Sequence, residues 1–408
     1  MSFNSMATED LSETVTDTGT VIVSDTVKYI GVDDTTIDLF ESQYVVQDGV
    51  SYNSYVIIDE KIAVMDTVDK RGMVQWEEKL LNVLEGRKVD YLIIHHLEPD
   101  HAGSINRLIE LYPDITLVGN VKTFSMLPQF FDFDVEVKVH VVKENDTLSL
   151  GAHELKFIMS PMVHWPEVMV SYDIKDKILF SADGFGRFGA LGLTKDKEWI
   201  CEARRYYFNI VGKYGVSVQT LLKKVSGLEI NIICPLHGPV LNENIAYYVG
   251  MYDTWSSYKP ESNGVLIAYA SIHGNTAYAA KKLGEMLAEL GEEKVVISDL
   301  ARDDMAEVIE NAFRYDRMIV AAASYDGGVF PCMQDFLNHL QSKTYQNRKV
   351  AIVENGSWAP SAGRVMKSML ESMKNIDLVE EIVTIRSTVK QADIENLEKL
   401  AKVMADKN

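Results

Sequence analysis

The sequence predicts a two-domain protein of mixed α/β and α+β class, in which a strand-rich sandwich precedes a doubly wound parallel sheet. The chain has 408 residues, which is more than one hydrophobic core usually spans. Short strand-like runs dominate residues 27–234, whereas strands and helices alternate regularly from residue 265 onward. Strict alternation of this kind is typical of a parallel sheet covered by helices on both faces.

The strands of the first domain are predicted by short apolar runs bounded by turn residues. The expected strands are 27–31, 55–59, 61–65, 89–95, 115–118, 135–142, 155–159, 168–172, 178–181 and 230–234. The amphipathic stretch 71–84 predicts a helix, and a further helical stretch runs from 242 to 255. We therefore expect a strand-dominated domain with covering helices.

The second domain is predicted by five strands that alternate with five helices. The expected strands are 265–269, 295–298, 318–322, 350–354 and 382–385, and the expected helices are 276–290, 305–311, 332–341, 362–373 and 391–405. A polar segment with Pro and Gly precedes them and is typical of a domain linker. The expected divisions are an acidic, mobile or loosely docked extension (1–26), a first domain (27–257), a linker (258–263) and a second domain (264–408).

The charge balance excludes two classes of partner. Forty Lys and Arg against 60 Asp and Glu give a net charge of −20, which repels phosphate backbones and anionic lipid. We expect neither nucleic acid nor membrane binding. The first 27 residues hold acidic side chains but no Lys or Arg, unlike a signal peptide, so a cytoplasmic location is expected.

Metal chemistry in this chain must use His and carboxylate ligands. The three cysteines, Cys201, Cys234 and Cys332, are too far apart for a CxxC site. By contrast, His96, Glu98, Asp100 and His101 crowd into one turn directly after a strand. In an extended turn, residues 96, 98 and 100 would point toward one centre, with His101 on its opposite side. The alternative is a loop of solvated charges in which Asp100 caps the next helix.

Three further ligand-type residues, His164, Asp183 and His237, each follow an apolar strand. Each one alone is more often a structural histidine or a turn aspartate than a ligand. Together with the HxExDH turn they provide four imidazoles and three carboxylates. That number of donors is sufficient for two metal ions with one bridging carboxylate.

Phosphate binding is predicted at the start of the second domain, where strand 265–269 runs through Ser271 into a helix that begins near Thr276. Helix N-terminal N–H groups and nearby hydroxyls bind phosphate. No Lys or Arg occurs between Lys259 and Lys281, so a Walker loop is excluded. A simple strand-to-helix turn is the alternative.

Two more loops lie at strand ends of the same sheet, 324–328 and 355–360, and each carries one aromatic residue that could stack on or edge a planar cofactor ring. The alternative is that both aromatics anchor their loops. The candidate cofactor-binding residues of the three loops are Ser271, His273, Gly274, Asn275, Thr276, Ser324, Tyr325, Asp326, Gly327, Gly328, Asn355, Gly356, Ser357 and Trp358.

The first domain resembles the metallo-β-lactamase fold, an αββα sandwich whose usual motif is HxHxDH. Here Glu98 replaces the second His, which adds a hard anionic ligand and favours iron over a zinc hydrolase centre. The second domain resembles flavodoxins, whose SxxGNT phosphate loop for FMN is matched at 271–276. Its second loop departs from the usual pattern, because Ser324, Tyr325 and Asp326 stand where a Thr and an Asn are common.

The combination resembles the flavodiiron proteins over residues 27–406, in the short class without a fused rubredoxin domain. The resemblance implies FMN and two Fe ions, with Asp183 bridging. One iron would be held by His96, Glu98 and His164, and the other by Asp100, His101 and His237. It also implies reduction of O₂ to water, of NO to N₂O or of both, with rubredoxin or a similar donor, in a head-to-tail homodimer or a dimer of dimers.

Two rival functions stay open at this point. One is a two-zinc hydrolase with an accessory flavodoxin-like domain, and Glu98 counts against it. The other is a flavin electron carrier whose first domain is structural, and the seven intact ligand positions count against that.

Overall fold

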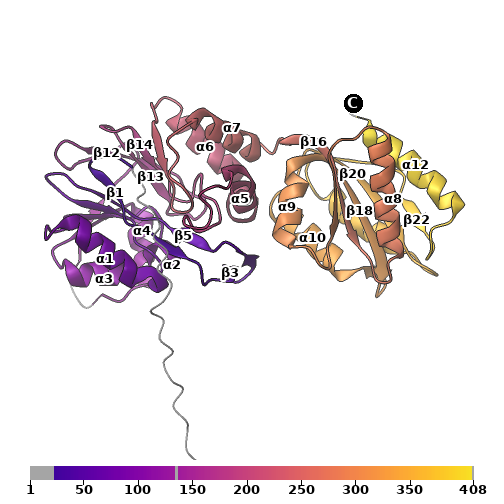
Figure 1. The fold of residues 1–408 in the computed structure, drawn as a ribbon, viewed down its shortest axis with the longest axis horizontal. Coiled ribbons are helices and arrows are strands. Elements are labelled where there is room, and N and C mark those ends of the chain that lie inside the picture. The colour runs from indigo at the N-terminus through magenta and orange to yellow at the C-terminus, as the bar shows by residue number, and fades with distance from the viewer. Residues whose placement is uncertain (1–22, 134–136, 407–408) are drawn as a thin grey trace, which may run out of the picture.

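The computed structural model describes residues 23–133 and 137–406, which form two lobes side by side (Figure 1). The first lobe contains the indigo-to-rose part of the chain, and the second contains the orange-to-yellow part. Most of the expected extension, residues 1–22, lies outside the described residues. Residues 23–26 pack on the first lobe: Val23 is buried, and the Ser24 hydroxyl donates to Asp176 over 2.8 Å.

The first lobe is a sandwich of two mixed sheets, as the sequence predicted. The first sheet has the order β1 (Val27–Tyr29), β6 (Tyr55–Ile57), β7 (Ala63–Met65), β8 (Tyr91–Ile93), β9 (Thr116–Gly119) and β10 (Lys138–Val141). The second has the order β11 (Thr147–Ser149), β12 (Glu154–Met159), β13 (Met169–Asp173), β14 (Ile178–Phe180) and β15 (Ile232–Cys234). Alternate strand residues such as Ile57, Ile93 and Phe180 meet in a buried layer between the sheets.

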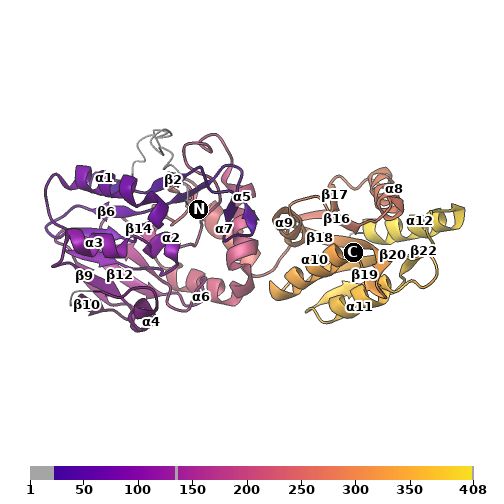
Figure 2. The ribbon, with the colours of Figure 1, turned by 90° about the horizontal axis from the view of Figure 1, so that it is seen from below.

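Helices cover the outer faces of this sandwich, which gives the αββα order (Figures 1 and 2). The helices are α1 (Met73–Leu84), α2 (Pro99–Ala102), α3 (Ile105–Leu111), α4 (Val121–Met126), α5 (Trp199–Tyr206), α6 (Gly215–Val225) and α7 (Ile245–Ser256). Helix α1 buries Trp76, Leu80 and Leu84, residues spaced four apart on one helical face. Two short strand pairs, β2 (Val32–Asp34) with β5 (Val50–Tyr52) and β3 (Leu39–Phe40) with β4 (Tyr44–Val45), extend the lobe.

The second lobe is a parallel sheet with helices on both faces. The order is β17 (Val295–Asp299), β16 (Ser262–Ala270), β18 (Tyr315–Tyr325), β20 (Arg348–Asn355), and then β21 (Ile376–Leu378) and β22 (Val383–Ile385), which pair with different parts of β20. A short β19 (Gly328–Val329) pairs with β18. The chain crosses from β16 to β17 on one side and then returns past β16 to β18 on its other side. This reversal puts a topological switch point between β16 and β18, where such sheets bind cofactors.

The covering helices of the second lobe divide between the two faces of the sheet. Helices α8 (Asn275–Glu289) and α12 (Gln391–Ala405) pack on one face, and α9 (Met305–Arg314), α10 (Pro331–Ser342) and α11 (Ala362–Glu371) pack on the other. Every strand and helix expected here is present, although β16 begins at Ser262, inside the expected linker. The short β19 and β21 were not expected, because neither has a run of apolar residues long enough to signal a strand.

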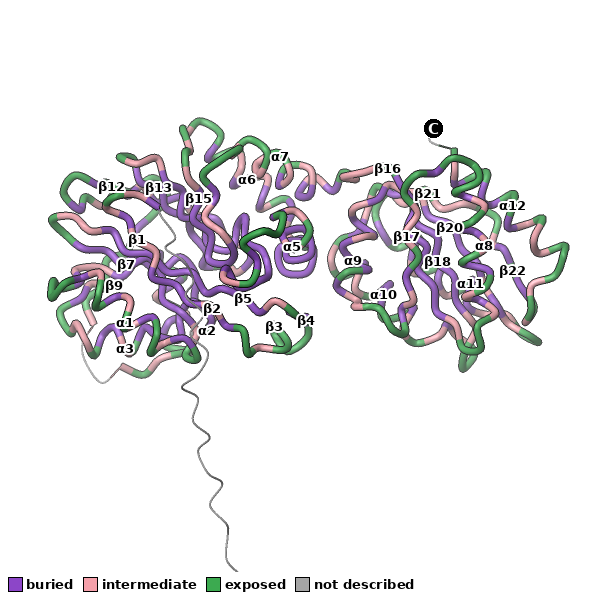
Figure 3. Tube along the Cα trace, viewed as in Figure 1, coloured by how far each residue is buried: buried purple, intermediate pink, exposed green. Residues whose placement is uncertain are grey.

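Buried contacts hold the two lobes together, mainly between α5 and the turns after it in the first lobe and α9 in the second. The ring of Phe208 stacks on Phe313 with 4.3 Å between centroids. The Arg204 guanidinium donates to Glu261 over 2.6 Å, and Arg205 donates to Asp304 over 2.7 Å. Most residues of α5 are buried (Figure 3). None of the described helices is long and apolar enough to cross a bilayer.

Candidate metal centre and cofactor cavity

The HxExDH turn is placed by the end of β8 and the start of α2. Pro99 occupies the first helical position after Glu98, where its missing N–H costs no hydrogen bond. Asp100 and His101 therefore lie in a helical turn. The prediction of an extended turn is therefore wrong. The helical backbone turns the Asp100 side chain away from the side on which His96 and Glu98 lie. The four ligand-type side chains thus divide into two pairs.

The first pair meets His164 and forms one candidate metal group. The Glu98 Oε2 atom lies 3.2 Å from His96 Nε2 and 3.1 Å from His164 Nε2. The Asp183 Oδ2 atom lies 3.3 Å and 3.2 Å from the same two nitrogens. Two imidazoles and two carboxylates therefore converge on one point.

The second pair meets His237 and forms the other group. The Nε2 atoms of His101 and His237 lie 3.1 Å apart, and Asp100 Oδ2 lies 3.2 Å from each. The other oxygen of Asp183, Oδ1, lies 3.3 Å from His101 Nε2 and 3.7 Å from His237 Nε2. Asp183 is thus the carboxylate that faces both groups with one oxygen each.

The buried carboxylates of the two candidate metal groups lack hydrogen-bond donors in the described part of the chain, which fits cations bound between the side chains. Within the described residues, both oxygens of buried Asp100 and of buried Asp183 make no hydrogen bond, although imidazole nitrogens surround them. Buried carboxylates left in this way are costly unless a cation satisfies them. Imidazole with carboxylate is a donor set that suits iron. The residues therefore fit two metal ions that share Asp183.

The charges of the two groups act on each other strongly. Burial alone would lower the pKa of the histidines, but the facing carboxylates raise the pKa of His101 to about 10 and of His164 to about 9. Burial would raise the pKa of Asp183, but His96 and the other imidazoles hold it well below its usual range. The site consequently favours positive charge at its centre.

Two carboxylates that sequence reasoning missed support the ligand turn from behind. Glu167 is fully buried, and its Oε1 lies 2.8 Å from His96 Nδ1. Asp66 accepts the His95 backbone N–H over 2.8 Å and also contacts the His95 ring. In the sequence, the one feature that could have drawn attention to Glu167 is its position three residues after the candidate ligand His164. No sequence feature distinguishes Asp66, because a lone Asp after a strand is a common turn residue.

One aromatic residue that was also missed, Tyr206, lies beside the ring of His237. Tyr206 of α5 is buried, with its ring centroid 5.5 Å from that of His237. Burial raises the pKa of its phenol, and the charges of the nearby site carboxylates raise it further. Tyr206 therefore presents a neutral hydroxyl near the candidate metal groups.

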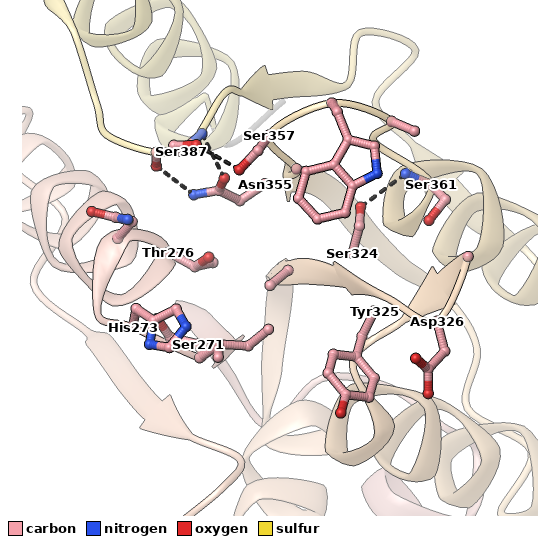
Figure 4. A pocket seen from close by; sticks show the side chains of 17 residues that line it. Ser271, His273, Thr276, Ser324, Tyr325, Asp326, Asn355, Ser357, Ser361 and Ser387 are labelled. Atoms are coloured by element: carbon pink, nitrogen blue, oxygen red, sulfur yellow. Dashed lines mark hydrogen bonds between the residues drawn. The ribbon is translucent and has the colours of Figure 1, made fainter.

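A cavity of about 490 Å³ opens at the carboxyl ends of β16, β18 and β20 (Figure 4). Its lining includes twelve of the fourteen predicted residues, all but Gly274 and Gly328. Gly274 lies directly before α8 with φ +89°, a conformation that suits glycine, and its N–H donates to the Ser271 hydroxyl over 3.1 Å. The lining residues that were not predicted are Ile272, Ala323, Ala359, Ser361 and Ser387.

Hydrogen bonds between loops fix the walls of this cavity (Figure 4). The Asn355 side chain donates to the Ser387 carbonyl over 2.9 Å and accepts its N–H over 3.0 Å. The Ser324 hydroxyl accepts the Ser361 N–H over 2.8 Å. The side chains of Tyr325 and Trp358 stay open to solvent, with Trp358 90% exposed. The cavity therefore has a rigid polar floor and an aromatic rim.

Comparisons with known proteins give matches that extend over most of the chain. Residues 50–238 match a family model described as "ODP family beta lactamase". The chain is 28% identical over 352 residues to an anaerobic nitric oxide reductase flavorubredoxin of Escherichia coli, covering 84% of this chain and 73% of that protein. Its structure matches rubredoxin oxygen:oxidoreductase from Desulfovibrio gigas with a TM-score of 0.88 and 26% identity, covering 95% of this chain and 98% of the other. Together these comparisons support the flavodiiron protein family for this chain.

A second solved structure supports the same fold assignment. The flavodiiron protein of Giardia intestinalis aligns with a TM-score of 0.89 at 23% identity, covering 95% of this chain and 96% of that one. The lactamase-like sandwich and the flavodoxin-like sheet of this chain therefore have the fold of flavodiiron structures.

Proposed function

We propose that this protein is an oxidoreductase that takes electrons from an external carrier through FMN and reduces O₂ to water, NO to N₂O or both at a di-iron centre. The observation that carries the proposal is Asp183, whose two buried oxygens each face two imidazoles without a hydrogen bond. The names of the relatives in E. coli and D. gigas support the reaction class, one with NO and one with oxygen.

The proposed ligand sets follow the two candidate metal groups. One iron takes His96, Glu98 and His164 and the other takes Asp100, His101 and His237, with Asp183 shared. When bound, the iron pair supplies single electrons and open coordination positions for a diatomic substrate. The protein holds the imidazoles with Nε2 inward, and the buried setting limits the entry of water.

The proposed FMN site is the cavity of the second lobe. Backbone N–H groups at the start of α8 and the hydroxyls of Ser271 and Thr276 would hold the phosphate without a cation. Tyr325 and Trp358 would border the flavin ring, since both line the same cavity. The exposed side chains of Tyr325 and Trp358 would leave this rim accessible to an electron donor such as rubredoxin.

The substrate is tested by anaerobic turnover of O₂ and of NO, side by side, with reduced rubredoxin and purified protein of known iron and FMN content. We expect about two irons and one FMN per chain and consumption of at least one gas. Two zinc ions and no iron after growth in iron-replete medium would contradict the proposal and restore the hydrolase alternative. Flavin reduction without consumption of either gas would point to a carrier instead.

We propose that the chain works as a head-to-tail dimer, in which the FMN of one chain serves the iron pair of the other. In support, the residues that line the cavity and those of the metal groups lie in different lobes and do not overlap. Complementation tests this, with a D183N chain that lacks iron and an S271A/T276V chain that lacks FMN. The mixed dimer is expected to be active although each parent is not, and inactivity of the mixture would contradict transfer between chains.

The domain boundaries and the cellular location of the protein are also proposals. We propose a domain division at residues 258–263, although Tyr258 at its start is buried and its hydroxyl donates to the Gly212 carbonyl over 2.8 Å. Limited proteolysis that releases two stable fragments would support it. A lack of nucleic-acid or membrane partners remains a prediction from the net charge. A cytoplasmic location remains a prediction from the first 27 residues, which are unlike a signal peptide.

A further inference from the structure

The two candidate metal groups have matching donors but different support behind their histidines. Each group has two imidazoles and one carboxylate of its own, and both share Asp183. The difference lies at the Nδ1 atoms, which point away from the centre. Behind a metal-bound imidazole, the partner of this nitrogen sets the orientation and the basicity of the ring.

In the first group, the support is a carboxylate. His96 Nδ1 lies 2.8 Å from Glu167 Oε1, and both side chains are completely buried. The Leu97 N–H donates to the same Glu167 oxygen over 3.0 Å, and Asn120 donates to the Glu167 carbonyl over 2.6 Å. Glu167 is thus held rigidly against the ring of His96.

The charge of Glu167 has few other partners. Its second oxygen, Oε2, is buried and makes no hydrogen bond among the described residues. No described Lys or Arg forms an ion pair with Glu167, whose one ion-pair partner is His96. The negative charge therefore acts mainly on the imidazole of His96, in an interior where charges are poorly screened.

In the second group, the support is neutral or missing. His237 Nδ1 lies 2.7 Å from the backbone carbonyl of Ser51. The Nδ1 atom of His101 is buried and meets no hydrogen-bond partner within the described part of the chain. Neither ring is therefore polarised by a full charge from behind.

We infer that Glu167 is a positioning residue that makes the metal pair unequal, so that the iron held by His96, Glu98 and His164 is bound more tightly than its neighbour. A carboxylate behind an imidazole increases electron donation to the metal, and losing such a partner typically costs 10 to 100-fold in metal affinity. The same donation favours the ferric state, so this iron is oxidised first. The inference rests on the proposed di-iron function and adds which of the two irons is bound more tightly.

Iron release from the holoprotein tests the inference without any turnover measurement. Iron and FMN are quantified first, and a ferrous chelator then removes the metal under anaerobic conditions at pH 8. We expect two phases of equal amplitude in the wild type. In E167Q, which keeps the size of the side chain but removes its charge, the slow phase accelerates about 10-fold or more and the fast phase does not change.

The control is E41Q, at the exposed turn between β3 and β4, where Gln43 donates to the Glu41 carboxylate over 3.3 Å. Burial raises the pKa of Glu41, and the nearby charge of Glu98 raises it further. Glu41 nevertheless makes no hydrogen bond to a proposed ligand histidine among the described residues. Both phases should stay as in the wild type. If E41Q and E167Q act alike, general charge is the cause and the inference fails.

Further outcomes distinguish the effect of the Glu167 charge from a general loss of folding. Equal acceleration of both phases in E167Q, or no change in either, would overturn the inference. If E167Q loses FMN or its cooperative unfolding transition, E167D takes its place, because it keeps the charge and should keep two phases. A folded E167D with one phase contradicts the inference. Single-phase release from a wild type with two irons overturns it while the proposed function stands, whereas a chain without iron contradicts both.

Discussion

Asp183→Asn tests whether one carboxylate joins the two metal groups. Asp183 places one oxygen 3.3 Å from His101 Nε2 and the other 3.3 Å from His96 Nε2. Each group has four donors, so the substitution weakens one donor of four in both groups at once. Even a lost outer partner costs 10-fold or more. Two such losses give at least about 100-fold, or about 2.8 kcal/mol.

The assay is iron content after gel filtration against a chelator, together with the FMN absorbance of the same sample. We expect D183N to lose most of its iron and to keep FMN, because the cavity lies in the other lobe. The matched control is D173N, which alters a buried Asp that lies 2.9 Å from His153 Nδ1 outside both proposed ligand sets. D173N should keep its iron. If D183N retains two irons and full turnover, Asp183 does not bridge and the ligand assignment is wrong.

Three further predictions concern ligand identity, protons and flavin. Glu98→His should raise the zinc-to-iron ratio and lower gas consumption by more than about tenfold, and full iron with full turnover would contradict this. Because the pKa of His101 is raised to about 10 and that of His164 to about 9, both are protonated at pH 7 before metal binds. Ferrous loading of chelator-treated protein should therefore release protons, and iron affinity should rise with pH toward those values; dye-monitored loading without proton release would refute it. Ser271→Ala with Thr276→Val should lower FMN content but leave iron unchanged, which flavin fluorescence and metal analysis measure.

The candidate metal residues could be predicted because their signals are local. Four of them occupy one turn after a strand, and the other three each follow a strand of their own. Backbone direction in the turn was predicted wrongly. Pro99 begins α2 there, and a helical turn separates neighbouring side chains that an extended chain would align.

The cofactor cavity was predictable for a related reason. In a parallel sheet the carboxyl ends of all strands meet at one edge, so three loops far apart in sequence must come together. Ser387 was missed because its loop, after β22, has neither a glycine nor an aromatic residue to distinguish it. Its contacts with Asn355 arise only when β22 pairs with β20.

The sequence by itself determined the two architectures, the donor types and the choice of carboxylate in place of a second His at Glu98. These follow from periodicity and from the residues next to strand ends, which are local properties of the chain. The family resemblance, and no local pattern, implied how the donors divide between two centres. Only the tertiary structure decided which histidine has a charged partner behind it. Glu167 lies 71 residues from His96, and its contact with that ring depends on how the two sheets pack.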